Sequence, residues 1–211
     1  MNNNYAWLAE LGIKTILDIG ANEGQFAEKI SAILPEASLI CFEPLPEPFE
    51  KLKNKFAGKP GFSCLEIALG EREGRQKIFR NEYSPSSSIL TMKSTHKEAF
   101  EFARKEFSEE ISIRRLDSVA KQIKIEAPYL VKIDVQGYER QVIDGGIDII
   151  RSASIIIIET SFVELYEKSP LFGNIYDKMT SLGFRYTGSF EQLPRPSDGK
   201  ILQQDAIFQK L

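Results

Sequence analysis

The stretch Thr15–Gly24, TILDIGANEG, decides the fold of this chain. An apolar run contains Asp18, and the glycines Gly20 and Gly24 follow before an amphipathic segment that begins at Gln25. A strand, a glycine loop and a helix in this order open a βαβ unit, in which a right-handed helical crossover joins parallel strands. Glycine lets the backbone approach a ligand closely, and Gly20 could also adopt a positive φ. The stretch therefore predicts a ligand site at the carboxyl end of the first strand.

Short apolar runs and amphipathic stretches alternate along most of the remaining chain. We expect strands at 38–42, 62–69, 129–134 and 154–159, and helices at 25–34, 49–56, 138–150 and 171–182. The continuous β-branched run at 154–159 is typical of a strand covered on both faces, which favours the centre of the sheet. Strands at 184–187 and 205–208 follow each other without a helix, which predicts an antiparallel pair at the sheet edge. The fold class is therefore α/β with a mostly parallel sheet.

The segment from about 74 to 115 interrupts this alternation. It holds a strand-like run at 76–79, a serine cluster at 84–88 and a charged stretch at 97–107 that we expect to be helical. The charged run 97–110 is interpreted as a solvated helix face. We expect one domain, 1–211, with this insertion acting as a lid. The insertion and a loop at 188–200 are expected to set the choice of substrate.

Composition limits the classes of partner. The 211 residues are 42% hydrophobic and 27% charged, which suits one domain with a full core. A net charge of -3 and a pI near 5.5 provide no basic surface for nucleic acid or anionic membranes. The first residues do not form a signal peptide, and no apolar run approaches the roughly 20 residues of a membrane span. We therefore expect a cytoplasmic enzyme with a small-molecule partner; the pattern leaves its oligomeric state open.

Cysteine and histidine usage predicts no metal centre of the zinc type. Cys41 and Cys64 both lie in strand-like runs, so we expect buried free thiols rather than a disulfide. Neither cysteine has a histidine or a second cysteine at the spacing of metal ligands. The single histidine, His96, lies in the insertion, where it could reach over the site as a general base or be an exposed loop residue.

The glycine loop and the next strand together predict a nucleoside site. The loop has the spacing Gly-x-x-x-Gly, which differs from the Gly-x-Gly-x-x-Gly fingerprint of dinucleotide sites. S-adenosylmethionine carries a cationic amino group and a sulfonium but no phosphate, so Asp18 suits it better than a dinucleotide. Glu43 ends the second strand, 25 positions after Asp18, where an acid can accept hydrogen bonds from both ribose hydroxyls. The alternatives are a turn whose glycines serve packing and a solvated Glu43.

A second polar cluster follows the strand at 129–134. Asp134 and Gln136 should face the transferred methyl group or its acceptor, because the carboxyl ends of strands open into the ligand crevice. Asp134 could also be the N-cap of the next helix. Asp134 and Glu159 end what should be neighbouring strands, so they could share a divalent metal. A third ligand is not evident, and we do not favour the metal.

The chain resembles the FkbM-type methyltransferases over about residues 13 to 209. The motifs that carry the resemblance are residues 16–26 (ILDIGANEGQF), 42–46 (FEPLP), 68–70 (ALG), the serines before Ile89, 115–118 (RLDS), 130–139 (LVKIDVQGYE), 145–146 (GG), 158–159 (IE) and 205–208 (DAIF). Several motifs in a fixed order are far more specific than the glycine loop alone. Many relatives carry glutamate at the position of Gln136. The glutamine of this chain is neutral, so one possible charge near the acceptor is missing.

The resemblance implies a Rossmann-like class I methyltransferase with a seven-stranded sheet whose last strand is antiparallel and with helices on both faces. By analogy, the methionyl part of S-adenosylmethionine lies against Asp18, Gly20, Asn22 and Gly24, the ribose against Glu43 and Pro44, and adenine near Ala68 and Leu69. The expected activity is methyl transfer to a hydroxyl of a small molecule, sugar or glycan. The alternatives are a dinucleotide-dependent oxidoreductase and a catalytically silent S-adenosylmethionine-binding module.

Overall fold

A computed structural model describes residues 5–81, 88–90 and 106–211 of the protein. The strands are β1 (Thr15–Ile19), β2 (Ser38–Phe42), β3 (Phe62–Leu65), β4 (Ala68–Leu69), β5 (Gly74–Asn81), β6 (Glu106–Arg114), β7 (Tyr129–Ile133), β8 (Ile155–Ser161), β9 (Phe184–Pro194) and β10 (Ile201–Lys210). The helices are α1 (Trp7–Glu10), α2 (Gln25–Ile33), α3 (Pro46–Lys55), α5 (Leu116–Val119), the 3-10 turn η3 (Ala120–Gln122), α6 (Glu139–Gly145), α7 (Ile147–Ser152) and α8 (Phe172–Ser181).

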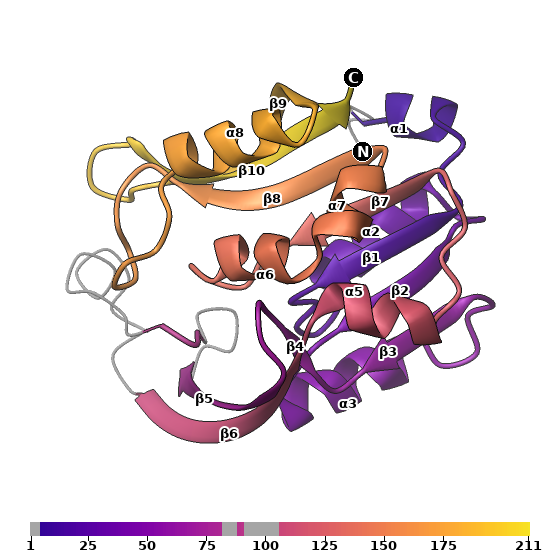
Figure 1. Ribbon diagram of the computed structural model, residues 1–211, viewed down its shortest axis with the longest axis horizontal. Helices are drawn as coiled ribbons and strands as arrows, with labels where there is room; N and C mark the ends of the chain where they lie inside the picture. The colour runs from indigo at the N-terminus through magenta and orange to yellow at the C-terminus, as the bar shows by residue number, and fades with distance from the viewer. Residues whose placement is uncertain (1–4, 82–87, 91–105) are drawn as a thin grey trace.

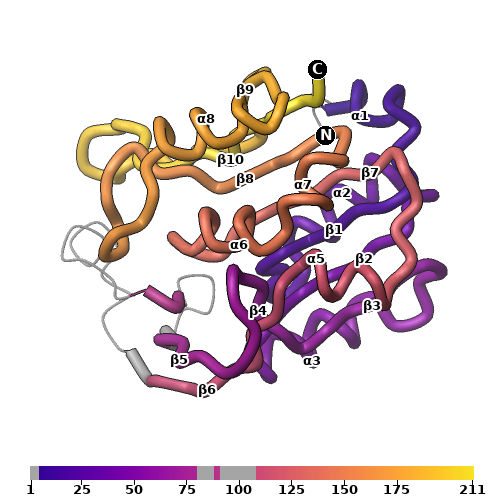
Figure 2. The backbone as a smooth tube through the Cα atoms, viewed as in Figure 1, coloured from indigo at the N-terminus to yellow at the C-terminus, as the bar shows by residue number. Residues whose placement is uncertain are grey.

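The main sheet has seven strands in the order β3-β2-β1-β7-β8-β10-β9. The first five strands in this order are parallel, whereas β10 runs antiparallel to both β8 and β9. This arrangement confirms the predicted α/β fold with an antiparallel last strand. Figure 2 shows β2 and β3 on one side of β1, and β8 and β10 on the other. The carboxyl ends of β1, β2 and β7 consequently meet at one edge of the sheet.

Helices cover both faces of this sheet, because apolar residues point alternately to either side of each strand. Leu17 and Ile19 of β1 face a core cluster that α5, α6, α7 and α8 complete, for example through Val142 and Met179. Ile16 faces the opposite cluster, which includes side chains of α1, α2 and α3. Buried strands between two helical layers are typical of doubly wound sheets (Figure 1). No helix among the described residues is long and apolar enough to cross a membrane.

The predicted strand at 62–69 is wrong as a single element. β3 pairs with β2 in the main sheet, but β4 leaves it and pairs with β6 in a second, three-stranded sheet of order β4-β6-β5. β5 and β6 form a long antiparallel ladder from Gly74 opposite Ile113 to Asn81 opposite Glu106 (Figure 1). These strands contain the ends of the predicted insertion. Glu106 and Phe107 therefore belong to a strand, which corrects the predicted helix at 97–107 and the helix face at 97–110 in that part; residues 91–105 lie outside the described residues.

Three further predictions need correction. The predicted helix at 138–150 is two helices, α6 and α7, and the break falls at Gly146. A Cβ at Gly146 would lie 2.8 Å from the Leu116 side chain, so glycine is required by close packing there. The strand at 154–159 lies beside the central strand β7 rather than at the centre. The predicted loop at 188–200 is mostly strand, because β9 extends to Pro194.

The two cysteines are free thiols, as predicted, although their burial differs. Cys41 is fully buried on β2, and burial raises the pKa of its thiol. Cys64 lies opposite Cys41 on β3 and is only half-buried. Both thiols pack against the apolar cluster beneath α2 and α3, which suits the role of small core side chains.

Candidate active site

The glycine loop between β1 and α2 lies against the end of β7. The backbone amides of Gly20 and Ala21 both donate to the carbonyl oxygen of Phe42, each at 3.0 Å. Gly20 has φ 81°, and a Cβ there would overlap the carbonyl oxygen of Asp134 and lie 2.9 Å from its carbonyl carbon. A residue with a side chain could not occupy this position without moving the backbone of one strand. Glycine at position 20 therefore allows the glycine loop to lie in direct contact with the backbone of Asp134.

The far end of the loop is shaped by Asn22 and Gly24. Asn22 has φ 48°, and its side-chain oxygen accepts a hydrogen bond from the Glu23 amide at 2.7 Å. Gly24 is the N-cap of α2 with φ 83°, and a Cβ there would lie 2.8 Å from Phe56 and 2.9 Å from Leu52. The loop thus turns with left-handed backbone at Gly20, Asn22 and Gly24, and the two glycines allow close packing against Asp134, Phe56 and Leu52.

Glu43 lies beside this loop, as the sequence predicts. Its carboxylate accepts hydrogen bonds from the Asn22 amide at 2.8 Å and from the Leu45 amide at 2.9 Å. The side chain is buried, and burial raises the pKa of Glu43 to about 7 although the two amides act in the opposite direction. Glu43 is therefore not a solvated strand end. It is a fixed acceptor that faces the glycine loop, with Pro44 half-buried after it.

Asp18 is the most deeply buried acid of the loop region, with 1% of its surface exposed. One of its carboxylate oxygens has no hydrogen-bond partner among the described residues. Burial raises the pKa of Asp18 to about 7, and the carboxylates of Asp134 and Glu43 add to the rise while Lys132 opposes it. Buried polar atoms are almost always paired, so an unpaired buried oxygen indicates a site for a hydrogen-bond donor or a cation.

Ala68 and Leu69 lie in β4, where both side chains are buried. Ala68 packs with Leu45, Ile78 and Ile113 in a small apolar cluster. Their predicted contact with adenine remains a prediction, and His96 lies outside the described residues.

Asp134 and Gln136 follow β7 and meet two side chains from elsewhere in the chain. The Gln136 amide donates to Asp134 Oδ1 at 2.8 Å and to Glu159 Oε2 at 2.9 Å, and its oxygen accepts from the Tyr166 hydroxyl at 2.7 Å. Gln136 has φ 53°, a left-handed conformation that is uncommon for a residue with a side chain. Burial and the neighbouring Asp134 raise the pKa of Glu159 well above its ordinary value. The amide therefore bridges the two carboxylates that the sequence suggested as metal ligands.

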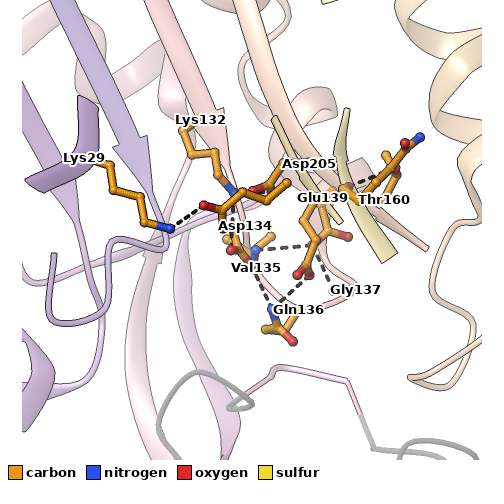
Figure 3. A network of polar contacts seen from close by, with 12 residues as sticks. Lys29, Lys132, Asp134, Val135, Gln136, Gly137, Glu139, Thr160 and Asp205 are labelled. Atoms are coloured by element: carbon orange, nitrogen blue, oxygen red, sulfur yellow. Dashed lines mark hydrogen bonds and ion pairs between the residues drawn. The ribbon is translucent and has the colours of Figure 1, made fainter. Parts of the chain in front are cut away.

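The loop after β7 is held by contacts from both of its sides. Glu139, buried at the start of α6, accepts hydrogen bonds from the amides of Val135 at 3.2 Å and Gly137 at 2.9 Å (Figure 3). Burial raises the pKa of Glu139 to about 7. The Ser88 hydroxyl donates to the carbonyl oxygen of Gln136 at 2.5 Å and so ties the insertion to the site. The N-cap of α6 is Tyr138, so Asp134 is not the helix cap that the sequence also allowed.

Sequence reasoning assigned no role to Lys132, Asp205, Tyr166 or Glu139. A charged residue inside an apolar strand run is a usable signal, because a buried charge needs a partner. Lys132 stands in such a run, whereas Asp205 follows two glutamines at the start of the apolar run 206–208. The two side chains form an ion pair of 2.9 Å. Tyr166 has no such signal, since it lies in a segment after β8 with no regular pattern. Among the described residues, no three acidic, histidine or cysteine side chains form a group that could hold a metal ion.

The fold is that of the class I methyltransferases. A search of solved structures supports the fold: an rRNA methylase from Streptococcus thermophilus superposes with a TM-score of 0.50 at 10% identity, over 97% of this chain and 92% of that one. This similarity concerns the fold alone.

The family model described as the methyltransferase FkbM domain matches residues 18–186. The chain belongs to the FkbM methyltransferase family, which implies S-adenosylmethionine as the methyl donor.

Two curated relatives match most of this chain. The 2-O-methyltransferase NoeI of Sinorhizobium fredii is 30% identical over 194 residues, which cover 89% of this chain and 77% of that protein. The hexuronic acid methyltransferase AglP of Haloferax volcanii is 27% identical over 145 residues, which cover 67% of this chain and 54% of that protein. The comparisons give no support to a dinucleotide-dependent oxidoreductase.

Proposed function

We propose that the protein is an S-adenosylmethionine-dependent O-methyltransferase that acts on a hydroxyl of a small molecule, sugar or glycan. The observation that carries the proposal is the buried oxygen of Asp18, which has no partner in the described part of the chain and lies beside the glycine loop and Glu43. The names of NoeI and AglP support oxygen as the accepting atom and a sugar as the acceptor class.

The residues around the loop fit S-adenosylmethionine. In this proposal Asp18, with its free oxygen, holds the methionyl amino group, and Gly20, Asn22 and Gly24 let that part of the molecule lie against backbone. Glu43 holds the ribose hydroxyls through lone pairs that its two amide contacts leave available. Pro44, Ala68 and Leu69 are assigned to the nucleoside side by the same analogy. When bound, S-adenosylmethionine supplies an electrophilic methyl group on a positively charged sulfur.

Asp134 is assigned to the acceptor. Its side chain is 34% exposed, whereas the other carboxylates of the cluster are more buried, so an acceptor can reach it. In the proposed reaction the acceptor oxygen forms a bond to the methyl carbon, the carbon–sulfur bond breaks, and the hydroxyl proton passes to Asp134 directly or through water. Gln136 fixes the orientation of Asp134. The protein otherwise contributes alignment and the exclusion of water.

Replacing Glu43 with alanine is expected to weaken binding of both S-adenosylmethionine and its demethylated product about ten- to a hundredfold. A hydrogen bond to a charged acceptor contributes about 1.5 to 3 kcal/mol, and the ribose is common to both ligands. Calorimetry on the folded variant measures the effect. The exposed Glu28 of α2 provides a matched control, since Glu28→Ala should bind both ligands as wild type does. Unchanged affinity in Glu43→Ala would remove Glu43 from the site.

Calorimetry tests the first alternative, and a turnover assay tests the second. A dinucleotide-dependent oxidoreductase would bind NAD or NADP, whereas the proposal expects no heat of binding with either. A silent binding module would bind S-adenosylmethionine without consuming it in the presence of any hydroxyl acceptor.

We propose further that the insertion at about 74–115 acts as a lid over the acceptor. The contact between Ser88 and the Gln136 carbonyl supports this, because it links the insertion to the loop that carries Asp134. The Leu90 amide donates to the Ser88 hydroxyl at 3.0 Å, so its exchange reports on this contact. Hydrogen exchange is expected to slow at 88–90 when cofactor and acceptor bind, while the β5–β6 ladder stays protected throughout. Equally strong protection at 88–90 in both states would indicate a rigid insertion.

A further inference from the structure

Lys132 is a lysine buried within the main sheet. Its side chain is 2% exposed, and its neighbours along β7, Val131 and Ile133, belong to the apolar core. A buried ammonium is costly unless charged or polar partners compensate for the lost water. Here it donates to Asp205 Oδ1 at 2.9 Å and to Asp134 Oδ2 at 3.3 Å (Figure 3). One of these partners is the carboxylate that we assign to the acceptor.

Asp205 reaches Lys132 from a distant part of the chain. It lies on β10, opposite Glu159 of β8, and β8 in turn pairs with β7. The ion pair therefore crosses one intervening strand and connects the antiparallel edge of the sheet to the end of β7. The Asp205 side chain is 16% exposed, so water competes little for the ammonium. The position of Lys132 is consequently fixed by a residue outside the loop that carries Asp134.

The surroundings of the ammonium carry a marked excess of acid. The groups that face or influence it are Asp18 on β1, Asp134 after β7, Glu159 on β8, Asp205 on β10 with Glu191 of β9 nearby, and the Phe26 ring of α2 at 5.7 Å. Burial alone would lower the pKa of Lys132, but the carboxylates of Asp134, Asp205 and Glu159 more than offset it and raise that pKa. Lys132 thus remains a cation at neutral pH.

The two oxygens of Asp134 have different partners. Lys132 contacts Oδ2, and the Gln136 amide contacts Oδ1 at 2.8 Å. Without the ammonium, the Asp134 carboxylate would lose its ion-pair partner at Oδ2 and keep the Gln136 contact at Oδ1. Nearby carboxylates disfavour the ionised form of a carboxyl group, whereas a nearby cation favours it. A buried ion pair is in itself weak evidence for a role in stability, because apolar residues of similar volume often serve as well. Its contact with the partly exposed Asp134 points to a role in the reaction.

We propose that Lys132 is a positioning residue for methyl transfer, seated by Asp205, and that its ammonium keeps the Asp134 carboxylate ionised and oriented toward the acceptor hydroxyl. This inference rests on the proposed function, because it takes Asp134 as the proton acceptor. Asp205 acts on Asp134 only through Lys132 and through its own negative charge.

The titration of Asp134 tests this arrangement without cofactor or acceptor. Carbon NMR of protein labelled at the aspartate carboxyls, in the presence of a chelator, follows Asp134, whose signal is assigned by its loss in Asp134→Asn. In Lys132→Met the midpoint of its titration should rise by about 1 to 3 pH units, because a cation within 4 to 6 Å has been removed. In Asp205→Asn the midpoint should fall, because a negative charge is lost while the ammonium stays. Merely structural damage would not move the two midpoints in opposite directions.

Lys178 provides the matched control, since it forms a 2.7 Å ion pair with Asp144 outside the site. Lys178→Met should leave the Asp134 midpoint unchanged. An unchanged or lower midpoint in folded Lys132→Met would overturn the proposal. If that variant does not fold, Lys132→Gln, which keeps a polar side chain but no charge, decides by the same criterion: a higher midpoint supports the proposal, and an unchanged or lower one overturns it.

Activity then separates this proposal from the proposed function. With a hydroxyl acceptor that the wild type methylates, the acidic limb of the kcat profile should move to higher pH in Lys132→Met by the same amount as the Asp134 midpoint, with the affinity for S-adenosylmethionine retained. Failure of the wild type to methylate any hydroxyl would contradict the proposed function and leave the titration result standing. A shifted midpoint with an unshifted kcat limb would overturn the role of Lys132 in the reaction.

Discussion

Replacing Asp134 with asparagine is expected to lower the turnover number about 100- to 10,000-fold, the usual contribution of a positioned general base. Asparagine keeps the shape and can still contact Gln136, but it can neither accept the hydroxyl proton nor pair with the Lys132 ammonium. Binding of S-adenosylmethionine should change much less, because the residues assigned to the methionyl and ribose parts lie on β1, in the loop after it and directly after β2. Turnover and calorimetric affinity measured on the same folded preparation give both quantities.

A control and a chelator make this result specific. Asp144→Asn removes an aspartate of similar chemistry that pairs with Arg140 and Lys178 away from the site, and it should leave turnover unchanged. Loss of wild-type activity in the presence of a chelator would indicate that Asp134 binds a metal rather than accepts the hydroxyl proton. Turnover of Asp134→Asn within a few-fold of wild type would show that the carboxylate has only a structural role in the loop after β7.

Replacing Gly20 with alanine is expected to reduce the free energy of unfolding by about 2 to 5 kcal/mol. Left-handed backbone costs a residue with a side chain about 1 to 2 kcal/mol, and overlap of the new Cβ with the Asp134 carbonyl adds the cost of overpacking. The overlap should also push the glycine loop away from β7 and abolish binding of S-adenosylmethionine. Urea denaturation monitored by circular dichroism measures the loss of stability.

Gly58 separates the two causes, because its φ of 82° matches the 81° of Gly20 and a Cβ there would meet nothing within 4 Å. Gly58→Ala should therefore cost only about 1 to 2 kcal/mol and leave cofactor binding intact. An equal loss of unfolding free energy in the two variants would mean that the contact between the glycine loop and Asp134 does not contribute to stability.

The parts of the site that follow local rules could be predicted from the sequence. A strand, a glycine loop and a helix follow one another within a few residues, and Glu43 comes at the end of the next strand. The βαβ pattern alone therefore predicted where the proposed cofactor residues lie. Asp134 and Gln136 were predicted by the same rule, since they come directly after a buried strand.

The parts that depend on distant pairing could not be predicted in this way. β4 joins β6 instead of continuing β3, and the segment at 62–69 contains no local feature that distinguishes one outcome from the other. The break between α6 and α7 did have a signal in Gly145 and Gly146, because consecutive glycines are poor helix formers. Lys132 also had one, namely a single charge inside an apolar strand, whereas Asp205 follows two glutamines and had none. Their meeting across β8 required the order of the strands.

The most direct test of the account is to incubate the wild-type protein with S-adenosylmethionine carrying a labelled methyl group and a panel of sugar and small-molecule hydroxyl acceptors, and to identify the products by mass spectrometry and NMR. The account predicts a labelled methyl ether on a hydroxyl oxygen, formed at the expense of S-adenosylmethionine and lost in Asp134→Asn. Label on nitrogen or carbon, or bound S-adenosylmethionine that no acceptor consumes, would contradict it.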